Sequence, residues 1–470
     1  MATIFKNIFW STFTSILQLY TGSVVFIVLA KLMTVNDFGI LSFGFSLNAL
    51  ALIVADFGFS LMVVKDYPKY QQGQGSYFVN SLLAKMIISL VGCAFFFIYL
   101  LIFYKGEWLL VGFIYILFAL VASYIIYLQA ILRVSNEFGQ YTATNLIYAI
   151  IITLVVILYW QLKFSLFHLV ALLLMAKTVQ LCYTFFLCRH AFIPYAINTK
   201  QIAMLLKSSW SFGVFSILGI FYFMVDTQII SLYLGAKEVA LYQSVFRIIL
   251  ILMLFSDILT NVLLPYLSFK FYQQQDLTML VSKFFIFLLV VGCTFFLVFT
   301  SFKSEILTIL YTSAYQEAAI LVLPFSMVLV LRTVSSLLGN ILTISNKQVY
   351  RVFTVSVSLV ISLGLNLFLI PKYGILAAAW TSVLVHIILL AMYVVFSKKE
   401  IPSLKLFTAP VIWLLTTMAF LYWIINERYS GNYLILMIGI LIWSVVVYGI
   451  MKRDNNFGFL QKLLHEKGVG

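Results

Sequence analysis

Residues 208–268 read SSWSFGVFSILGIFYFMVDTQIISLYLGAKEVALYQSVFRIILILMLFSDILTNVLLPYLS. The pattern predicts two long apolar helices joined by the polar turn LGAKEVALY at 234–242. Three charged residues, Asp226, Arg247 and Asp257, fall inside the apolar parts of this hairpin. A charge at the centre of a bilayer helix costs roughly 2.5–3.5 kcal/mol on insertion scales, so such charges usually pair with one another or line a pathway. The hairpin therefore predicts a membrane protein in which the three charged residues inside the membrane have a structural or functional role.

The composition of the chain extends this prediction to all 470 residues. Hydrophobic residues make up 64% and charged residues 9%, with a mean hydropathy of +1.09. Apolar runs of about 20 residues recur, which no soluble class explains. Because barrel strands would alternate apolar and polar residues, we expect an all-α polytopic membrane protein. The net charge of +14 sits in short loops between the runs, which indicates membrane orientation and no nucleic-acid partner.

Apolar runs bounded by charge, Gly or Pro predict about fourteen transmembrane helices. They lie at roughly 8–30, 39–62, 78–103, 109–132, 142–161, 165–188, 208–234, 238–266, 279–301, 316–344, 350–370, 374–396, 404–425 and 431–451. The start of the chain has one Lys and no small-residue cleavage site, so we interpret the first run as a retained span. All four cysteines fall inside predicted spans, and we expect neither disulfides, a metal site nor another cofactor.

Lys and Arg residues are divided unevenly between alternate loops. Eighteen lie on the side shared with both termini: Lys6, Lys65, Lys69, Arg133, Arg189, Lys200, Lys207, Lys270, Lys283, Lys347, Arg351, Lys398, Lys399, Lys405, Lys452, Arg453, Lys462 and Lys467. Seven lie on the other side: Lys31, Lys105, Lys163, Lys237, Lys303, Lys372 and Arg428. By the positive-inside rule this bias predicts that both termini are cytoplasmic.

The chain contains an internal repeat. A shift of 201 residues brings NDFGILSFGFS at 36–46 onto KEVALYQSVFR at 237–247, and LRVSN at 132–136 matches LTISN at 342–346. Spans one to six are therefore expected to repeat as spans seven to twelve, which gives two pseudo-symmetric six-helix lobes plus two C-terminal helices. The predicted parts are an N-terminal lobe at 1–190, a cytoplasmic linker at 191–207, a C-terminal lobe at 208–397, two extra spans at 398–452 and a cytoplasmic tail at 453–470.

Two of the interior charges stand at matching depth in the outer half of the membrane. Asp226 lies ten residues before Ala236 and Arg247 eleven after it, so antiparallel helices place them at one level. An ion pair is the expected arrangement. It is either a structural salt bridge that lets the hairpin insert, or a gate that breaks and reforms when two lobes rock.

The depth of a residue in the membrane can be estimated by counting residues from the nearest turn, which we call depth counting. It predicts two further pairs in the cytoplasmic half. Asp56 and Lys85 stand at one level, and Asp257 with Lys283 nearly repeats the arrangement in the second half. One interpretation is that these pairs fix helix packing. The other is a gate or coupling role, in which a buried Asp binds H⁺ or Na⁺.

Lys177 and Arg332 lie near the middle of predicted spans six and ten, with no acidic residue at a similar depth. Unpaired cations beside an aqueous cavity are what an anionic substrate such as a pyrophosphate needs, and Arg offers a forked donor that matches phosphate. Snorkelling of both side chains toward the membrane surface is the alternative.

Signals for an enzyme are sparse. The sequence has no Walker loop, no HExxH and no Cys/His ligand cluster. Asp37, in NDFG, is an acid in a predicted outer loop, where membrane glycosyltransferases keep catalytic carboxylates. Because the loops leave little room for a catalytic domain or an ATPase, we expect a protein that is not an enzyme.

Several segments resemble polysaccharide flippases of the multidrug/oligosaccharidyl-lipid/polysaccharide exporter superfamily, and the O-antigen flippase type most. They are VDTQIISLYLGAKEVALYQSVFRI at 225–248, LLPYLS at 263–268, LMTVNDFGILSFGFSLNALALIVADFGFS at 32–60 and LNLFLIPKYGILAAAWTSVLVH at 365–386. The resemblance implies a flippase that moves undecaprenyl-pyrophosphate-linked sugar repeat units from the inner to the outer leaflet of a bacterial plasma membrane. It also implies a cationic cavity in which Arg247, in a matched segment, is the first candidate to bind substrate.

The resemblance implies partners as well. These are the lipid-linked oligosaccharide, membrane lipids, a coupling H⁺ or Na⁺, and a polysaccharide polymerase with its chain-length regulator. Three rivals stay open: a multidrug cation exporter of the same superfamily, a membrane O-antigen polymerase or glycosyltransferase, and a scaffold in polysaccharide assembly. Unpaired cations speak against the exporter, since a cationic drug prefers acidic walls.

Overall fold

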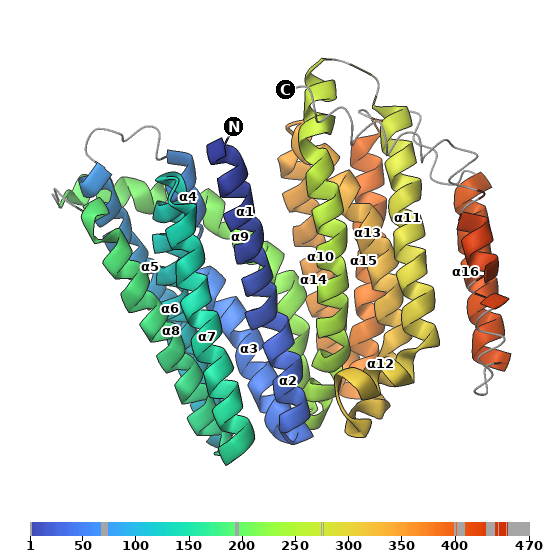
Figure 1. Ribbon diagram of the computed structural model, residues 1–470, viewed down its shortest axis with the longest axis horizontal. Coiled ribbons are helices and arrows are strands. Elements are labelled where there is room, and N and C mark those ends of the chain that lie inside the picture. Colours follow the sequence, from blue (N-terminus) through green and yellow to red (C-terminus); the bar gives the residue numbers. More distant parts are fainter. Residues whose placement is uncertain are drawn as a thin grey trace. The chain divides into compact units, whose positions relative to one another are not determined.

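The computed structural model describes residues 2–66, 74–192, 197–273, 275, 277–398, 401, 409–428, 438–439, 441–447 and 449. Across these residues every regular element is a helix, as predicted. Within the described ranges, twelve helical segments are long and apolar enough to cross a membrane (Figure 1). The all-α polytopic prediction is therefore confirmed, whereas the predicted number of fourteen spans is not.

The first of two compact units comprises Met1–Ser244 and Asn366–Gly374. Its helices are α1 (Ala2–Leu19), the π-helix η1 (Tyr20–Val24), α2 (Val25–Leu32), α3 (Val35–Asp56), α4 (Phe59–Asp66), α5 (Gln74–Phe103), α6 (Gly106–Val134), α7 (Phe138–Leu162), α8 (Leu166–Cys188), the 3₁₀ helix η3 (Arg189–Phe192) and α9 (Thr199–Tyr233). The start of α10 (Ala236–Tyr272) and the end of α14 (Gln348–Tyr373) also belong to it. Within the unit α3 packs against α6 and α9, and α6 packs against α8.

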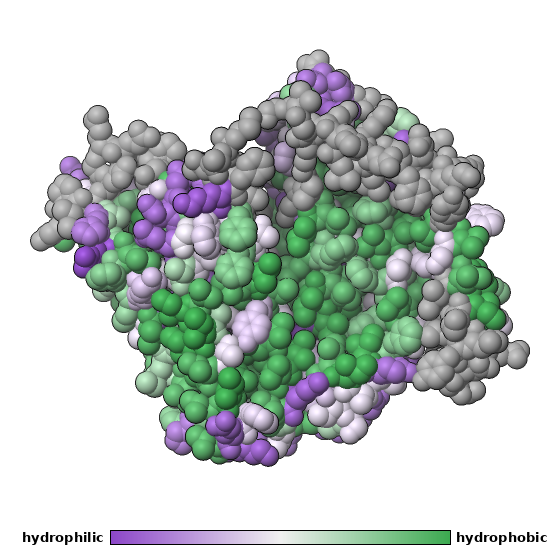
Figure 2. All heavy atoms as spheres, viewed as in Figure 1, coloured by the Kyte–Doolittle hydropathy of each residue, from purple (hydrophilic) through white to green (hydrophobic). Residues whose placement is uncertain are grey.

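The second compact unit comprises Val245–Leu365 and Ile375–Gly470. Besides the larger parts of α10 and α14, it contains α11 (Thr278–Ser301), α12 (Lys303–Leu310), the 3₁₀ helix η4 (Ser313–Leu321), α13 (Val322–Ile344), α15 (Ile375–Ser397) and α16 (Ala409–Arg428). Helix α13 packs against both α11 and α15, and α16 packs against α11. In each unit hydrophobic residues cover the middle of the helices and hydrophilic residues gather near their ends (Figure 2), as lipid surroundings require.

Side-chain caps start two of the helices that carry candidate residues. The Thr34 hydroxyl oxygen accepts a 3.1 Å hydrogen bond from the Asp37 N–H, and the hydroxyl donates to Asp37 Oδ2 at 2.8 Å, which caps α3. Asn198 caps α9 by accepting from the Gln201 N–H at 3.2 Å. Such caps satisfy N–H groups that have no partner inside the helix. Helix α9 therefore already occupies most of 191–207, the stretch expected to link two lobes.

The internal repeat is visible in matching turns. Helices α3 and α10 begin 201 residues apart, the shift that aligns the two sequences. Helices α6 and α13 both end before an Asn with left-handed backbone, Asn136 with φ 61° and Asn346 with φ 57°. In both turns the next residue donates its N–H to the carbonyl five residues back, at 2.8 Å. Asn tolerates the left-handed region better than most residues, which explains its place in both copies.

The predicted C-terminal spans are described in part. Helix α16 overlaps the predicted thirteenth span, 404–425. In the predicted fourteenth span, 431–451, Trp443 donates its indole N–H to Thr294 Oγ1 of α11 at 2.9 Å. The predicted tail at 453–470 lies outside the described residues.

Candidate functional site

Helix α3 stops at a buried acid that is followed by two left-handed residues. Asp56 is its last residue, and Phe57 and Gly58 have φ angles of 44° and 73°. A Cβ at Gly58 would collide with Phe212 of α9, so both the φ angle and the close approach require glycine here. The predicted second span is therefore interrupted beside Asp56. Membrane transporters use such helix breaks to place polar groups at their binding sites.

Asp56 forms the ion pair with Lys85 of α5 that depth counting predicts. Lys85 Nζ lies 2.9 Å from Asp56 Oδ1 and 3.1 Å from the carbonyl oxygen of Ala55. Lys85 is fully buried and Asp56 is 5% exposed. Ser60 of α4 donates to the same carboxylate oxygen, and the ring centroid of Tyr124 lies 5.6 Å from Lys85 Nζ. The pair is enclosed within the first unit, so removal of either partner leaves a buried charge uncompensated.

Asp226 of α9 is buried and accepts hydrogen bonds from two neutral donors. The Tyr242 hydroxyl donates to Oδ2 at 3.1 Å, and Asn366 Nδ2 donates to Oδ1 at 2.7 Å. Neither donor was predicted from the sequence, because the depths of charged residues alone do not reveal neutral partners. Arg247 belongs to the second unit, and its pairing with Asp226 stays a prediction.

Lys177 of α8 lies among aromatic and amide groups. Its Nζ donates to Gln180 Oε1 at 2.8 Å and lies 3.7 Å from the ring centroid of Tyr148 and 5.7 Å from that of Phe118. Among the described residues no carboxylate contacts Lys177, in agreement with the sequence. The two aromatic faces stabilise the ammonium group by cation–π attraction. A role in binding substrate stays a prediction.

Helices α10 and α13 meet along what we name the polar seam, which consists of Ser256, Asp257, Thr260, Arg332, Thr333 and Ser336. In the seam Arg332 Nη2 lies 3.5 Å from Asp257 Oδ1. Two hydroxyl contacts of 3.2 Å flank this ion pair, Ser256 to Thr333 and Ser336 to Thr260. Hydroxyl pairs of this kind join helices in membranes. The Arg332 and Asp257 side chains are still 22% and 36% exposed, so the ion pair reaches the surface of its unit.

Two predictions about this region are therefore wrong. Arg332 has an acidic partner, and that partner is Asp257, which was expected to pair with Lys283. The predicted eighth span ends near residue 266, whereas α10 continues to Tyr272. Asp257 thus lies fifteen residues before the end of α10, while Lys283 lies five residues after the start of α11. At 1.5 Å per residue their levels differ by about 15 Å.

Arg247 is 6% exposed and lies on α10 in the second unit. Its positive charge acts on Tyr311, which follows α12. Burial raises the pKa of Tyr311, and the Arg247 charge opposes that rise without cancelling it. Tyr311 packs against Tyr315 with ring centroids 5.1 Å apart. The guanidinium therefore lies in the neighbourhood of a buried aromatic pair, which the sequence pattern did not reveal.

Asp37, the acid considered for sugar transfer, has a structural task. Its carboxylate and N–H both bond to Thr34 at the start of α3. Within the described part of the chain, no three His, Cys, Asp or Glu residues gather in a way that could hold a metal ion.

Three comparisons relate the chain to known proteins. Over residues 4–271 it matches the family profile described as "Polysaccharide biosynthesis protein". It is 30% identical over 169 residues to the probable low-salt glycan biosynthesis flippase Agl15 of Haloferax volcanii, a stretch that covers 35% of this chain and 36% of that protein. The lipid II flippase MurJ, in an inward closed conformation, superposes with a TM-score of 0.71 at 14% identity, covering 98% of this chain and all of that one. An inward-facing multidrug resistance MATE family transporter of the MOP superfamily gives 0.61 at 14% identity, covering 84% and 96%.

At 14% identity the two solved structures show the fold alone. The chain is a multi-pass membrane protein with the fold of MurJ and MATE transporters. The profile match spans more than half of the 470 residues, so the chain belongs to the polysaccharide biosynthesis protein family that the profile describes. The resemblance stated from the sequence is thereby confirmed. The match to Agl15 spans about a third of either protein.

Proposed function

We propose that this protein is a flippase for lipid-linked polysaccharide repeat units. The substrate is an O-antigen or related unit on undecaprenyl pyrophosphate, which moves from the inner to the outer leaflet of a bacterial plasma membrane. Transport proceeds by alternating access of two lobes, with both termini in the cytoplasm. The observation that carries the proposal is the family membership over residues 4–271, supported by a relative named as a probable glycan flippase.

Three cations are proposed to receive the pyrophosphate. Arg247 is the first candidate, with Arg332 and Lys177 as further contacts. The Arg332–Asp257 distance of 3.5 Å exceeds the roughly 2.7–2.9 Å of a tight charge-assisted bond. A pyrophosphate that carries two negative charges therefore competes well with Asp257 for the Arg332 guanidinium. This competition offers a way to bind substrate reversibly at a site that carries no unbalanced charge when empty.

The buried acids are proposed as the moving or coupling groups. Asp226 with Arg247 forms an outer gate, and Asp56 with Lys85 forms an inner contact. Protonation of Asp56 or Na⁺ binding to it would weaken the ion pair with Lys85. An ion gradient would in this way be coupled to the helix break at Gly58. Lys283 keeps a separate place at the cytoplasmic start of α11.

The proposal is tested by following lipid-linked oligosaccharide in cells or inverted vesicles that synthesise it. The fraction that reaches the outer leaflet is compared for the intact protein, its absence, Arg247→Ala and the control Arg189→Ala, which removes an exposed Arg. Accumulation on the inner face without the protein and with Arg247→Ala, but not with the control, is expected. Normal crossing with failed joining or transfer of the units would refute a flippase and favour an enzyme or scaffold.

A further inference from the structure

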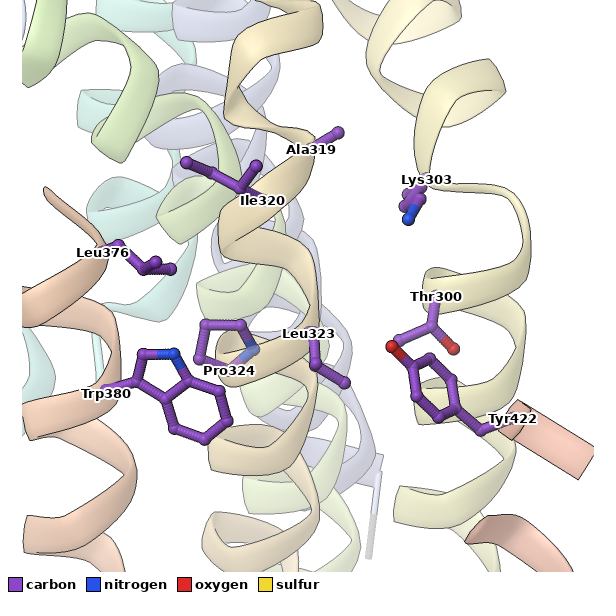
Figure 3. Close-up of a pocket in the computed structure, with 9 residues that line it drawn as sticks. All are labelled: Thr300, Lys303, Ala319, Ile320, Leu323, Pro324, Leu376, Trp380 and Tyr422. Carbon is purple, nitrogen blue, oxygen red and sulfur yellow. The ribbon is translucent and has the colours of Figure 1, made fainter. Parts of the chain in front are cut away.

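A cavity of about 310 Å³ lies within the second unit, where α11, α12, η4, α13, α15 and α16 approach one another (Figure 3). Its lining consists of Thr300, Lys303, Ala319, Ile320, Leu323, Pro324, Leu376, Trp380 and Tyr422. The volume is at the lower end of the range for small-molecule sites, about 300–1,000 Å³. It is too small for a lipid-linked oligosaccharide, and it fits a headgroup with the first part of a chain.

The lining offers hydrogen-bond donors and lacks acids. Lys303 is its only charged residue among the nine, and Trp380 and Tyr422 add an indole N–H and a hydroxyl. In the described part of the chain none of these three groups makes a hydrogen bond or ion pair. The Thr300 hydroxyl is already engaged, since it donates to the Phe296 carbonyl at 2.7 Å. The unused donors are complementary to an anionic group rich in oxygen.

The start of α12 adds to this complementarity. Lys303 is the first residue of α12, and the preceding Phe302 provides no side-chain cap. The first N–H groups of the helix therefore have no intrahelical acceptor and carry the positive end of its dipole. Glu305 in the same first turn already supplies one negative charge there, so an anion beside Lys303 would gain mainly from the ammonium group and in part from the N–H groups of the helix end.

The remaining walls are apolar and open to the membrane. Trp380 is 44% exposed and Ile320 is 57% exposed, while Pro324 is buried behind them. Lys303 and the start of α15 lie at helix ends that the positive-inside rule predicts on the outer face. A Trp at this level belongs to the interfacial belt where lipid headgroups meet chains.

We propose that this cavity binds one anionic phospholipid of the outer leaflet. Its phosphate contacts Lys303 and the start of α12, and the upper part of its acyl chain packs against Leu323, Leu376 and Trp380. The lipid acts as a ligand of the second unit that joins α16 to α13 and α15. This site does not depend on the transport proposed above, because its binding is measurable without any flux.

The test uses the purified full-length chain, with bound lipid counted by native mass spectrometry and stability followed by thermal unfolding. The probes are dioleoylphosphatidylglycerol, dioleoylphosphatidylcholine, undecaprenyl phosphate and sodium phosphate. Lys303→Gln removes the cation, Lys303→Arg keeps it, and Trp380→Phe removes the indole N–H while keeping a ring. Lys372→Gln is the matched control, since Lys372 is an exposed turn lysine that is absent from the cavity lining.

We expect one saturable phosphatidylglycerol per chain and a roughly tenfold weaker affinity in Lys303→Gln, as expected for the loss of one charge-assisted bond. Lys303→Arg and Lys372→Gln should bind as the unaltered protein does, and Trp380→Phe should bind several-fold more weakly. Equal binding of phosphatidylcholine, or unaltered binding by Lys303→Gln, would show non-specific surface lipid and overturn the proposal. Preference for undecaprenyl phosphate would instead make the cavity a substrate subsite, and stabilisation by sodium phosphate alone would make it a free-anion site; either result rejects the phospholipid.

Discussion

Lys85 Nζ lies 2.9 Å from Asp56 Oδ1, and both side chains are shut inside the first unit beside the left-handed residues Phe57 and Gly58. The ion pair thus fastens the end of α3 to α5, and the hydrogen bond from Ser60 of α4 to the same carboxylate spans the helix break. Separating the pair without burying a bare charge requires a new polar partner for each group, or the transfer of a proton from Lys85 to Asp56.

Lys85→Met should destabilise the protein by about 3–5 kcal/mol, the range for removing one partner of a buried ion pair. The reason is that Asp56 keeps its charge in an enclosed site. Asp56→Asn combined with Lys85→Met should recover most of that loss, because the pair is then replaced by neutral groups. Unfolding of purified protein in mixed micelles, titrated with SDS, measures both changes.

Transport by the Asp56→Asn, Lys85→Met double variant separates the two interpretations of the pair. A gate or coupling role predicts that the double variant folds but fails to transport. Equal transport and equal stability would assign the pair to packing alone.

Gly58→Ala should destabilise the first unit, whereas alanine at a glycine with open space around it should be tolerated. The φ of 73° at Gly58 is unfavourable for an L side chain, and the added Cβ meets the backbone and Cβ of Phe212. Gly219→Ala on the same α9 is the control, since nothing lies within 4 Å of the added Cβ. We expect Gly219→Ala to be neutral or stabilising by up to about 1 kcal/mol, because Ala favours a helix. Similar midpoints of thermal unfolding for the two variants would contradict a required glycine at the break.

Asp257→Asn should tighten the binding of undecaprenyl pyrophosphate, whereas Arg332→Gln should weaken it roughly tenfold. The neutral amide no longer competes for the Arg332 guanidinium, so the phosphate gains the contact without displacing a carboxylate. Titration of the lipid into purified protein measures both affinities. Thr260→Val removes a seam hydroxyl without changing charge, and it should leave the affinity unchanged. Weaker binding by Asp257→Asn would show that the acid positions Arg332 for the substrate instead of competing with it.

Much of this fold could be predicted because hydrophobic runs report directly on membrane helices. The internal repeat was also predictable, since Asn136 and Asn346 occupy equivalent left-handed turns. Counting residues from the turn found Asp56 with Lys85, because Asp56 lies ten residues before the end of α4 and Lys85 eleven after the start of α5. It failed for Asp257, because the true length of α10 shifts its level and because α13, two spans along the chain, supplies the partner.

Neutral partners and cavities leave a weaker trace in a sequence. Asn366, which donates to Asp226, is an ordinary amide in an apolar run, and only the folded chain brings α14 to α9. The lining of the cavity around Lys303 comes from segments more than one hundred residues apart in sequence. No local sequence pattern indicates that these segments come together in the folded chain.

Asp226 provides the last test, because its partners differ in kind. Tyr242 and Asn366 are neutral groups that donate hydrogen bonds to the carboxylate, and the sequence predicts Arg247 as its oppositely charged partner. Asp226→Arg and Arg247→Asp should each abolish transport, and the two together should restore a substantial part of it when outer-leaflet delivery of lipid-linked oligosaccharide is measured. Tyr242→Phe, which removes one neutral donor, should cost only about 1 kcal/mol of stability and leave transport near that of the unaltered protein. If the double exchange fails to restore transport in a protein that still folds, the proposed outer gate is refuted. Asp226 is then a packing residue of the first unit, and Arg247 is left with the proposed role in substrate binding only.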